Sequence, residues 1–319
     1  MCENRGISLF RANALYLLAA AGLVILDLAA TLLSSVRGLN TTVASAMLSV
    51  GYYALFLGAP VLLGAARRDQ GLDGLRLLPI PLSRALLIAL LAAATLILVS
   101  IVSMWFLALV EAVGGVPYET ALPMPASRAG IAGMVLQIAV LPGIFEELLF
   151  RGALLRAWEK RGGGYAVAVT TLLFAALHGT ILGLPSQLIS GAIMALLVLR
   201  LNSLYASMIF HTVYNGLNYG IALYAQSLLT PAESEAVAAM STVESLGGAF
   251  GLLTLVPSML LFALLTYFLY RACVRWGYPV LQSATRRTPM DWKTLAVLIS
   301  ALVTCAVYYV LDGIAIFGG

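Results

Sequence analysis

Long apolar segments recur along the chain and are separated by short polar connections. About twenty consecutive apolar residues are enough for a helix to cross the ~30 Å hydrocarbon core of a bilayer. The pattern predicts nine segments, at residues 12–35, 43–65, 84–110, 129–155, 165–183, 185–199, 203–226, 247–271 and 293–316. The sixth segment is short enough to be tilted or re-entrant, so eight full spans is the alternative.

These segments predict a helix bundle. Backbone N–H and C=O groups in hydrocarbon must be satisfied internally, which a helix achieves within one segment. The alternating segments of about ten residues that typify an outer-membrane barrel are absent from the sequence. The predicted fold is therefore all-α, a polytopic transmembrane bundle of eight to nine helices that forms a single integral membrane domain over residues 1–319.

The composition agrees with a membrane protein. Hydrophobic residues make up 61% of the chain and charged residues 10%, whereas roughly a quarter of an average soluble domain is charged. The first apolar stretch is too long for a signal peptide and has no clear cleavage site, so we expect a spanning helix there. Cys2, Cys273 and Cys305 are scattered, which indicates neither a zinc site nor a disulfide framework.

The cations follow a topological pattern. They gather in alternate connections: Arg5, Arg11, Arg67, Arg68, Arg76, Arg84, Arg156, Lys160, Arg161, Arg200, Arg271, Arg275, Arg286, Arg287 and Lys293. The other connections carry only Arg37 and Arg128. The positive-inside rule then places the N-terminus in the cytoplasm and, after nine crossings, the C-terminus outside. Because the cations lie at the ends of apolar segments, the net charge of +4 does not indicate nucleic-acid binding.

Few ionisable side chains fall inside the predicted spans, where each one is a functional-site hypothesis by default. They include Asp27, Glu146, Glu147, Arg151, His178 and His211, and Asn215 adds a polar amide. The chain has only two histidines, and both are in this set. Asp27 is interpreted as structural, because nothing near it in the sequence could pair with it.

The polar residues on three different segments can meet. At 1.5 Å per helical residue, Glu146, His178 and His211 lie roughly 12–20 Å from the cytoplasmic ends of their helices. A spacing of four places Glu147 with Arg151, and His211 with Asn215, on one helix face. One carboxylate could then face the histidines while the other pairs with Arg151. The sequence predicts a polar cavity within the membrane, in a core of about 129–226 flanked by helices of 1–128 and 227–319.

Pro142 lies just before the two glutamates and cannot donate a backbone hydrogen bond. We expect it to kink or restart this helix. A restart would leave Glu146 and Glu147 in a first turn, near free N–H groups and the positive end of the helix dipole.

Two kinds of chemistry fit these residues. A carboxylate beside an imidazole can act as a general base on water, and a His and an Asn on one face could donate hydrogen bonds to a developing oxyanion. Two His and one Glu could instead bind zinc, although the HExxH spacing is missing. Purely structural ion pairs and interhelical hydrogen bonds are the alternative for each residue.

Three motifs occur in order: FEELLFRG with Glu146, Glu147 and Arg151; FAALH with Phe174 and His178; and HTVYN with His211 and Asn215. This order resembles the CAAX protease and bacteriocin-processing family of intramembrane proteases, which includes the type II CAAX prenyl endopeptidases. The resemblance covers roughly residues 130–225 and implies a glutamate-dependent endopeptidase that needs no metal.

By position, the resemblance implies that Glu146 activates water with help from His178. His211 and Asn215 would form the oxyanion hole, and Glu147, Arg151 and Phe174 would support the site. The implied partners are the bilayer and a lipidated, possibly prenylated, or membrane-bound peptide that enters from the cytoplasm. A non-catalytic scaffold or bacteriocin-immunity protein, a zinc-dependent protease and a proton-coupled transporter stay open as alternatives, and zinc is not excluded.

Overall fold

The computed structural model describes residues 7–36, 41–66, 75–118, 125, 127–230, 232–233, 236, 240–278 and 290–318. All regular secondary structure within these residues is helical. The elements are α1 (Leu9–Ser34), α2 (Thr41–Tyr52), π-helical η1 (Tyr53–Gly58), α3 (Ala59–Ala66), α4 (Leu82–Ala112), α5 (Arg128–Val135), π-helical η3 (Leu136–Val140), α6 (Leu141–Glu147), π-helical η4 (Leu148–Leu154), α7 (Leu155–Trp158), 3-10 helix η5 (Glu159–Arg161), α8 (Gly163–His178), α9 (Leu184–Leu201), α10 (Leu204–Ser227), α12 (Thr242–Ser245), α13 (Ala249–Cys273) and α14 (Trp292–Phe317).

Every predicted apolar segment coincides with a helical stretch among the described residues, so the all-α prediction is confirmed. The second segment is α2, η1 and α3 in succession, and the fourth runs from α5 to η5. The fifth segment was predicted too long: α8 ends at His178, because Gly179 adopts a left-handed conformation with φ of 61° and such a residue terminates a helix. The sixth segment is an 18-residue helix, α9, rather than a shorter piece.

Among the residues that the structure describes, six helical stretches are long and apolar enough to cross a membrane. They are Leu9–Ser34, Leu82–Ala112, Arg128–Arg161, Leu184–Leu201, Ala249–Cys273 and Trp292–Phe317. The surface of these stretches is rich in exposed aliphatic and aromatic side chains, such as Leu28, Leu86, Leu264 and Val310, each more than half exposed. A soluble protein rarely exposes so much contiguous apolar surface. The chain is therefore a multi-pass integral membrane protein.

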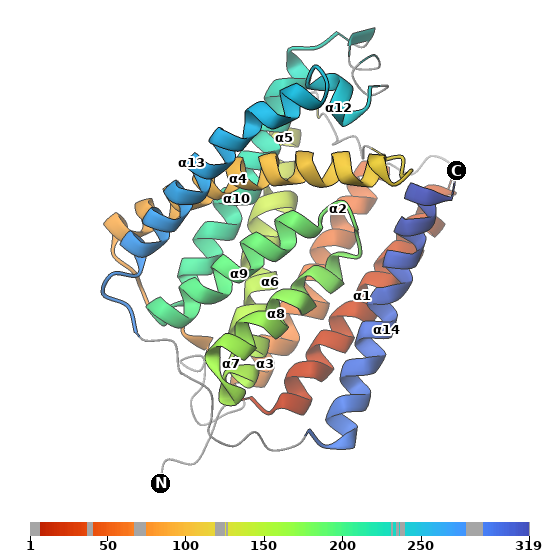
Figure 1. The fold of residues 1–319 in the computed structure, drawn as a ribbon. Coiled ribbons are helices and arrows are strands. Elements are labelled where there is room, and N and C mark those ends of the chain that lie inside the picture. The colour runs from red at the N-terminus through yellow and green to blue at the C-terminus, as the bar shows by residue number, and fades with distance from the viewer. Residues whose placement is uncertain are drawn as a thin grey trace.

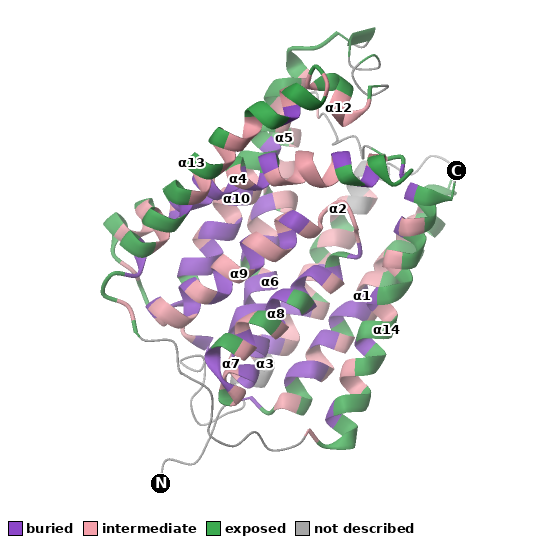
Figure 2. Cartoon of the chain, in the orientation of Figure 1, coloured by how far each residue is buried: buried purple, intermediate pink, exposed green. Residues whose placement is uncertain are grey.

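The helices form an inner group surrounded by outer ones. In Figure 1, α1 and α14 pack side by side along one edge, and α4 runs across the bundle with α13 packed against it. Helix α10 contacts α4, α6 and α9, while α8 packs on α9. Figure 2 shows buried residues concentrated on α6 and α8–α10, whereas α13 and α14 are largely exposed. The inner group, α6 to α10, carries every polar residue singled out in the three motifs.

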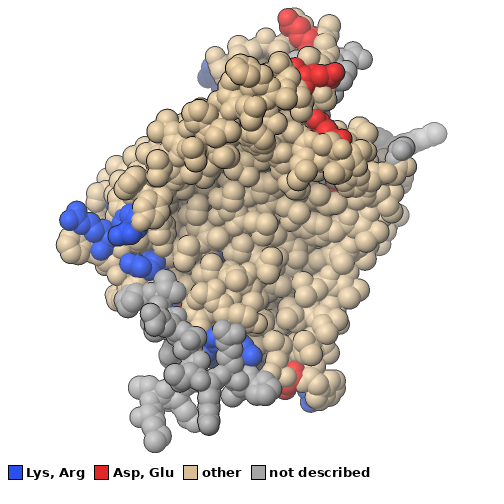
Figure 3. Space-filling model, in the orientation of Figure 1, with Lys and Arg blue, Asp and Glu red and all other residues tan. Residues whose placement is uncertain are grey.

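Charged side chains separate towards opposite ends of the molecule. On the face shown in Figure 3, Lys and Arg gather at the lower and left margin, and most Asp and Glu gather at the upper margin. Helix α1 starts at the basic end, and α14 ends at the opposite one. Parts of the connections between α3 and α4 and between α13 and α14, residues 67–74 and 279–289, lie outside the described residues.

Candidate active site

The helical stretch of Arg128–Arg161 carries the two glutamates and contains two π-helical parts, η3 and η4. A π-helical turn widens the backbone locally and often occurs at functional sites. Pro142 lies in the first turn of α6, yet the helix continues from η3 into α6 without a break. Glu146 and Glu147 are the last two residues of α6. The prediction that they occupy a first turn is therefore wrong, because Pro142 is accommodated beside a π-helical turn and the helix does not restart there.

Glu147 lies at the centre of a closed network. Its Oε1 accepts hydrogen bonds from Arg151 Nη1 at 2.7 Å and from His211 Nδ1 at 2.9 Å. Arg151 Nη2 donates to the Gly191 carbonyl on α9 at 2.9 Å. The Arg151 guanidinium also lies 4.7 Å from the centre of the Phe174 ring. The side chains of Glu147 and Arg151 are fully buried, so this ion pair ties α6, η4, α9 and α10 together.

Glu146 has a looser environment. Its Oε1 accepts a long hydrogen bond of 3.4 Å from the Tyr53 hydroxyl on η1. Its Oε2 lies 3.9 Å from His178 Nε2, too far for a direct hydrogen bond. No hydrogen-bond partner of this oxygen is found among the described residues. One carboxylate oxygen is thus free to act on a third group.

The tautomer of His178 follows from its own helix. His178 Nδ1 lies 2.8 Å from the carbonyl oxygen of Phe174, one turn earlier on α8. A carbonyl oxygen can only accept a hydrogen bond, so Nδ1 carries a proton. In the neutral imidazole, Nε2 is then an acceptor that faces Glu146.

Phe174 holds both imidazoles in place. Its ring centre lies 4.5 Å from that of His178 and 5.8 Å from that of His211. The Phe150 ring packs edge-on against it at 5.0 Å. Because Phe174 is also stacked on Arg151, this one buried ring contacts three polar members of the site.

Asn215 is tied to the helix of the glutamates. Its Nδ2 donates to the Ile138 carbonyl in η3 at 3.0 Å. Ile138 lies four residues before Pro142, which has no N–H to return to that carbonyl. The side-chain amide of Asn215 therefore satisfies a backbone group that the proline cannot. Nearby, α6 and α10 approach closely, since a Cβ on Gly143 would lie 3.0 Å from the backbone nitrogen of Thr212.

A cavity of about 240 Å³ adjoins these groups. His178, His211 and Asn215 lie on its wall with Phe174. The remaining lining residues are Ile138, Gly183, Ser186, Gln187, Ser190, Met194, Phe210, Tyr214 and Asn218. A polar cavity inside a bundle of apolar helices is where a substrate and water can meet.

The structure brings together all seven residues that the motifs singled out, but it distributes them differently than expected. Instead of one carboxylate that faces both histidines, Glu146 lies near His178 and Glu147 bonds His211. Asp27 lies outside the site, beside Tyr308 of α14, a partner that the sequence could not reveal. Within the described residues, no three His, Cys, Asp or Glu side chains are arranged to hold a metal ion.

Sequence reasoning missed several polar members of the site. Tyr53 contacts Glu146, and Ser186, Gln187 and Tyr214 line the cavity. The Tyr214 and Ser186 hydroxyls are 3.0 Å apart. Tyr214 directly precedes Asn215, and Gln187 is a polar residue inside an apolar helix. These two features of the sequence could have indicated that Tyr214 and Gln187 belong to the site.

Comparison with known proteins supports the resemblance seen in the motifs. Residues 128–217 match the family model described as type II CAAX prenyl endopeptidase Rce1-like. No curated protein and no solved structure matches the chain. The matched segment runs from the start of α5 into α10 and contains every motif residue from Glu146 to Asn215. Over residues 128–217, this multi-pass membrane protein is therefore similar to the Rce1-like type II CAAX prenyl endopeptidases, a family of proteases.

Proposed function

We propose that the protein is an intramembrane endopeptidase that hydrolyses a peptide bond near the C-terminus of a lipidated or membrane-bound peptide. The observation that carries the proposal is the pair formed by Glu146 Oε2 and His178 Nε2, which are 3.9 Å apart. Both atoms can accept a hydrogen bond, and their side chains are 11% and 31% exposed. A single water can contact both atoms at that separation.

The water is activated by this pair. It donates one hydrogen to Glu146 and the other to His178, so that a lone pair is left to attack the scissile carbonyl. As the new C–O bond forms, a proton passes to Glu146 and the carbonyl electron pair moves to oxygen. The carboxyl then returns that proton to the leaving nitrogen as the C–N bond breaks, which is general base and general acid catalysis by one group.

His211 and Asn215 suit the developing oxyanion, because both lie on the cavity wall and one turn apart on α10. Asn215 has a second N–H beyond the one bound to Ile138. His211 already donates Nδ1–H to Glu147, so it donates from Nε2 only as an imidazolium. Glu147 and Arg151 support the site by fixing His211, and we propose that no metal or other cofactor takes part.

The orientation in the membrane follows from charge. The described connections at the end where α1 begins are the more basic ones (Figure 3), and basic connections face the cytoplasm. We therefore propose a cytoplasmic N-terminus and cavity opening and an external C-terminus. The substrate's C-terminal peptide would enter from that side while its lipid, possibly a prenyl group, stays in the bilayer. The catalytic core is about 129–226, and the other helices flank it in one domain.

The test is a cleavage assay with the full chain in lipid nanodiscs. Prenylated and unprenylated C-terminal peptides are incubated with wild type and with Glu146→Gln, with and without a chelator, and the released peptides are identified by mass spectrometry. We expect cleavage near the C-terminus that resists the chelator and falls by about 10²–10⁴-fold in the variant, the usual contribution of a general base.

Asp27→Asn is the matched control, because it removes another carboxylate from a spanning helix but lies outside the site. We expect it to retain activity. No cleavage of any peptide by folded wild type would favour the scaffold alternative. Loss of activity with the chelator, restored by zinc, would replace this mechanism by a metal-dependent one.

A further inference from the structure

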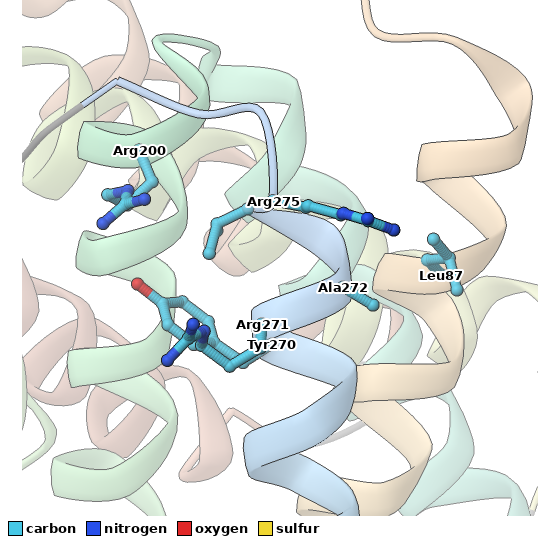
Figure 4. Close-up of a pocket in the computed structure, with 7 residues that line it drawn as sticks. Leu87, Arg200, Tyr270, Arg271, Ala272 and Arg275 are labelled. Carbon is cyan, nitrogen blue, oxygen red and sulfur yellow. The ribbon is translucent and has the colours of Figure 1, made fainter.

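A second cavity lies away from the glutamates, where α4, α9 and α13 meet. Its volume is about 760 Å³. It is lined by Leu87, Arg200, Tyr270, Arg271, Ala272, Val274 and Arg275 (Figure 4). Arg200 is in the last turn of α9, and Tyr270 and Arg271 are in the last turn of α13. We refer to this cavity as the arginine pocket.

The arginine pocket concentrates positive charge, with three of its lining residues being arginines. Among the described residues, no carboxylate forms an ion pair with Arg200, Arg271 or Arg275. Arg271 Nη1 donates to the Tyr267 hydroxyl at 2.9 Å, and the Arg275 guanidinium lies 5.3 Å from the Trp276 ring centre. The Nε atom of Arg200 is buried, with no hydrogen-bond partner in the described structure. A buried N–H donor without an acceptor is energetically unfavourable. A ligand with hydrogen-bond acceptors would remove this cost.

The pocket is held in shape by the backbone. The amide of Tyr278 donates to the Arg200 carbonyl at 2.7 Å, which ties the turn after α13 to the end of α9. A Cβ at Gly277 would clash with that same carbonyl oxygen, so the close approach requires glycine there. In Figure 4, Arg200 and Arg271 extend beside the Tyr270 ring, while Arg275 reaches towards Leu87.

The surroundings of the pocket place it at a membrane surface. Exposed apolar side chains lead to it along both helices: Leu86 and Leu90 flank Leu87 on α4, and Leu264 and Phe268 precede Ala272 at intervals of four on α13. Trp276 is 79% exposed and Tyr278 61%, and exposed Trp and Tyr are enriched at the level of lipid headgroups. The pocket therefore has a basic, hydrogen-bonding interior that adjoins a surface suited to acyl chains.

We propose that the arginine pocket binds the headgroup of an anionic phospholipid. Guanidinium groups bind phosphate oxygens with paired, charge-assisted hydrogen bonds, and basic pockets between spanning helices are suited to anionic headgroups. The phosphate lies between Arg200 and Arg271, and the acyl chains lie along the exposed leucine and phenylalanine side chains of α4 and α13. The bound lipid joins α9 to α13, the outer helix that is packed against α4.

The test measures lipid binding by the full chain in detergent. Phosphatidylglycerol and phosphatidylcholine with the same acyl chains are titrated into wild type and into the double variant Arg200→Gln/Arg271→Gln, and bound lipid is counted by native mass spectrometry. Since each arginine near a charged lipid contributes about 1 kcal/mol, we expect wild type to prefer phosphatidylglycerol by about 10- to 30-fold and the double variant to lose this preference.

Arg11→Gln is the matched control, because it removes one arginine from the first turn of α1, outside the pocket. It should keep the preference. Arg200→Lys/Arg271→Lys, which keeps the charge, should restore part of it even if the glutamine variant is less stable. An unchanged preference in the folded glutamine variant would overturn the proposal. Competition by inorganic phosphate or glycerol 3-phosphate as effective as that of the lipid would instead show that the pocket takes a soluble anion.

Discussion

Two adjacent glutamates on one helix have opposite environments. The Glu147 side is closed: the carboxylate and Arg151 are fully buried, and Arg151, His211 and Gly191 are joined by hydrogen bonds of 2.7–2.9 Å. The Glu146 side is open: its hydrogen bond to Tyr53 is long at 3.4 Å, and its Oε2 lies 3.9 Å from His178 Nε2. The comparison indicates that one carboxylate maintains the architecture and the other is available for chemistry.

The difference arises from one step along the helix. Successive residues point about 100° apart, so Glu147 is directed at His211 on α10 while Glu146 is directed at η1 and the end of α8. The π-helical η4 begins immediately after the pair and carries Arg151. Structural and reactive roles can therefore be separated by substituting neighbouring positions.

The largest effect on stability is expected for Arg151→Ala. The substitution leaves the Glu147 carboxylate buried without its cation, which should lower the free energy of unfolding by about 3–5 kcal/mol. Glu146→Gln should lower it by less than about 1 kcal/mol, because no short hydrogen bond is lost. Thermal unfolding of the purified variants in one detergent measures both values. Equal destabilisation by the two substitutions would abolish the distinction between the closed and open sides.

A smaller effect, on turnover, is expected for Asn215→Ala. If its free N–H stabilises the oxyanion, kcat should fall by about 10²-fold with little change in KM. Asn218→Ala is the control. Asn218 lines the same cavity about one turn further along α10 but has no role in the proposed chemistry. Peptide cleavage kinetics separate kcat from KM. Similar losses in both variants would mean that Asn215 contributes only to the general polarity of the cavity.

The smallest effect is expected for Tyr53→Phe. A single neutral hydrogen bond contributes about 0.5–1.5 kcal/mol, so kcat/KM should fall by roughly 2- to 10-fold while folding is retained. Tyr52→Phe provides the control, because the Tyr52 hydroxyl donates to the Ala19 carbonyl on α1 and not to Glu146. A larger loss of activity in Tyr52→Phe than in Tyr53→Phe would show that packing of η1, rather than the bond to Glu146, matters.

Much of the fold could be predicted because lipid imposes simple rules. Apolar stretches such as 84–110 and 293–316 correspond to α4 and α14 with shifts of a few residues at their ends. The errors occurred where local backbone geometry decides the outcome. Gly179 ends α8 at His178, and Pro142 is accommodated beside a π-helical turn without a restart. Neither hydropathy nor helical periodicity encodes these conformations.

The sequence predicted which residues form the site, but not which of them contact one another. Ionisable residues in apolar segments are rare enough to be noticed, and a spacing of four correctly joined Glu147 to Arg151. Tyr53 and Gln187 were missed, because tyrosine and glutamine also occur in membrane helices for packing. The arginine pocket was equally hidden: Arg200 and Arg271 are seventy-one positions apart in the sequence and appeared only as topogenic charges.

The sequence by itself determined that the chain crosses the membrane repeatedly and that Glu146, Glu147, Arg151, His178, His211 and Asn215 form its polar interior. The physical reason is solvation. In hydrocarbon, a helix satisfies its own backbone hydrogen bonds, and ionisable side chains are stable only when they pair with one another or face a cavity. Only the tertiary structure decided which histidine meets which glutamate, and that Asn215 donates to the Ile138 carbonyl, four residues before Pro142. Those pairings depend on the rotation and approach of separate helices, which contacts between α6, α8 and α10 determine.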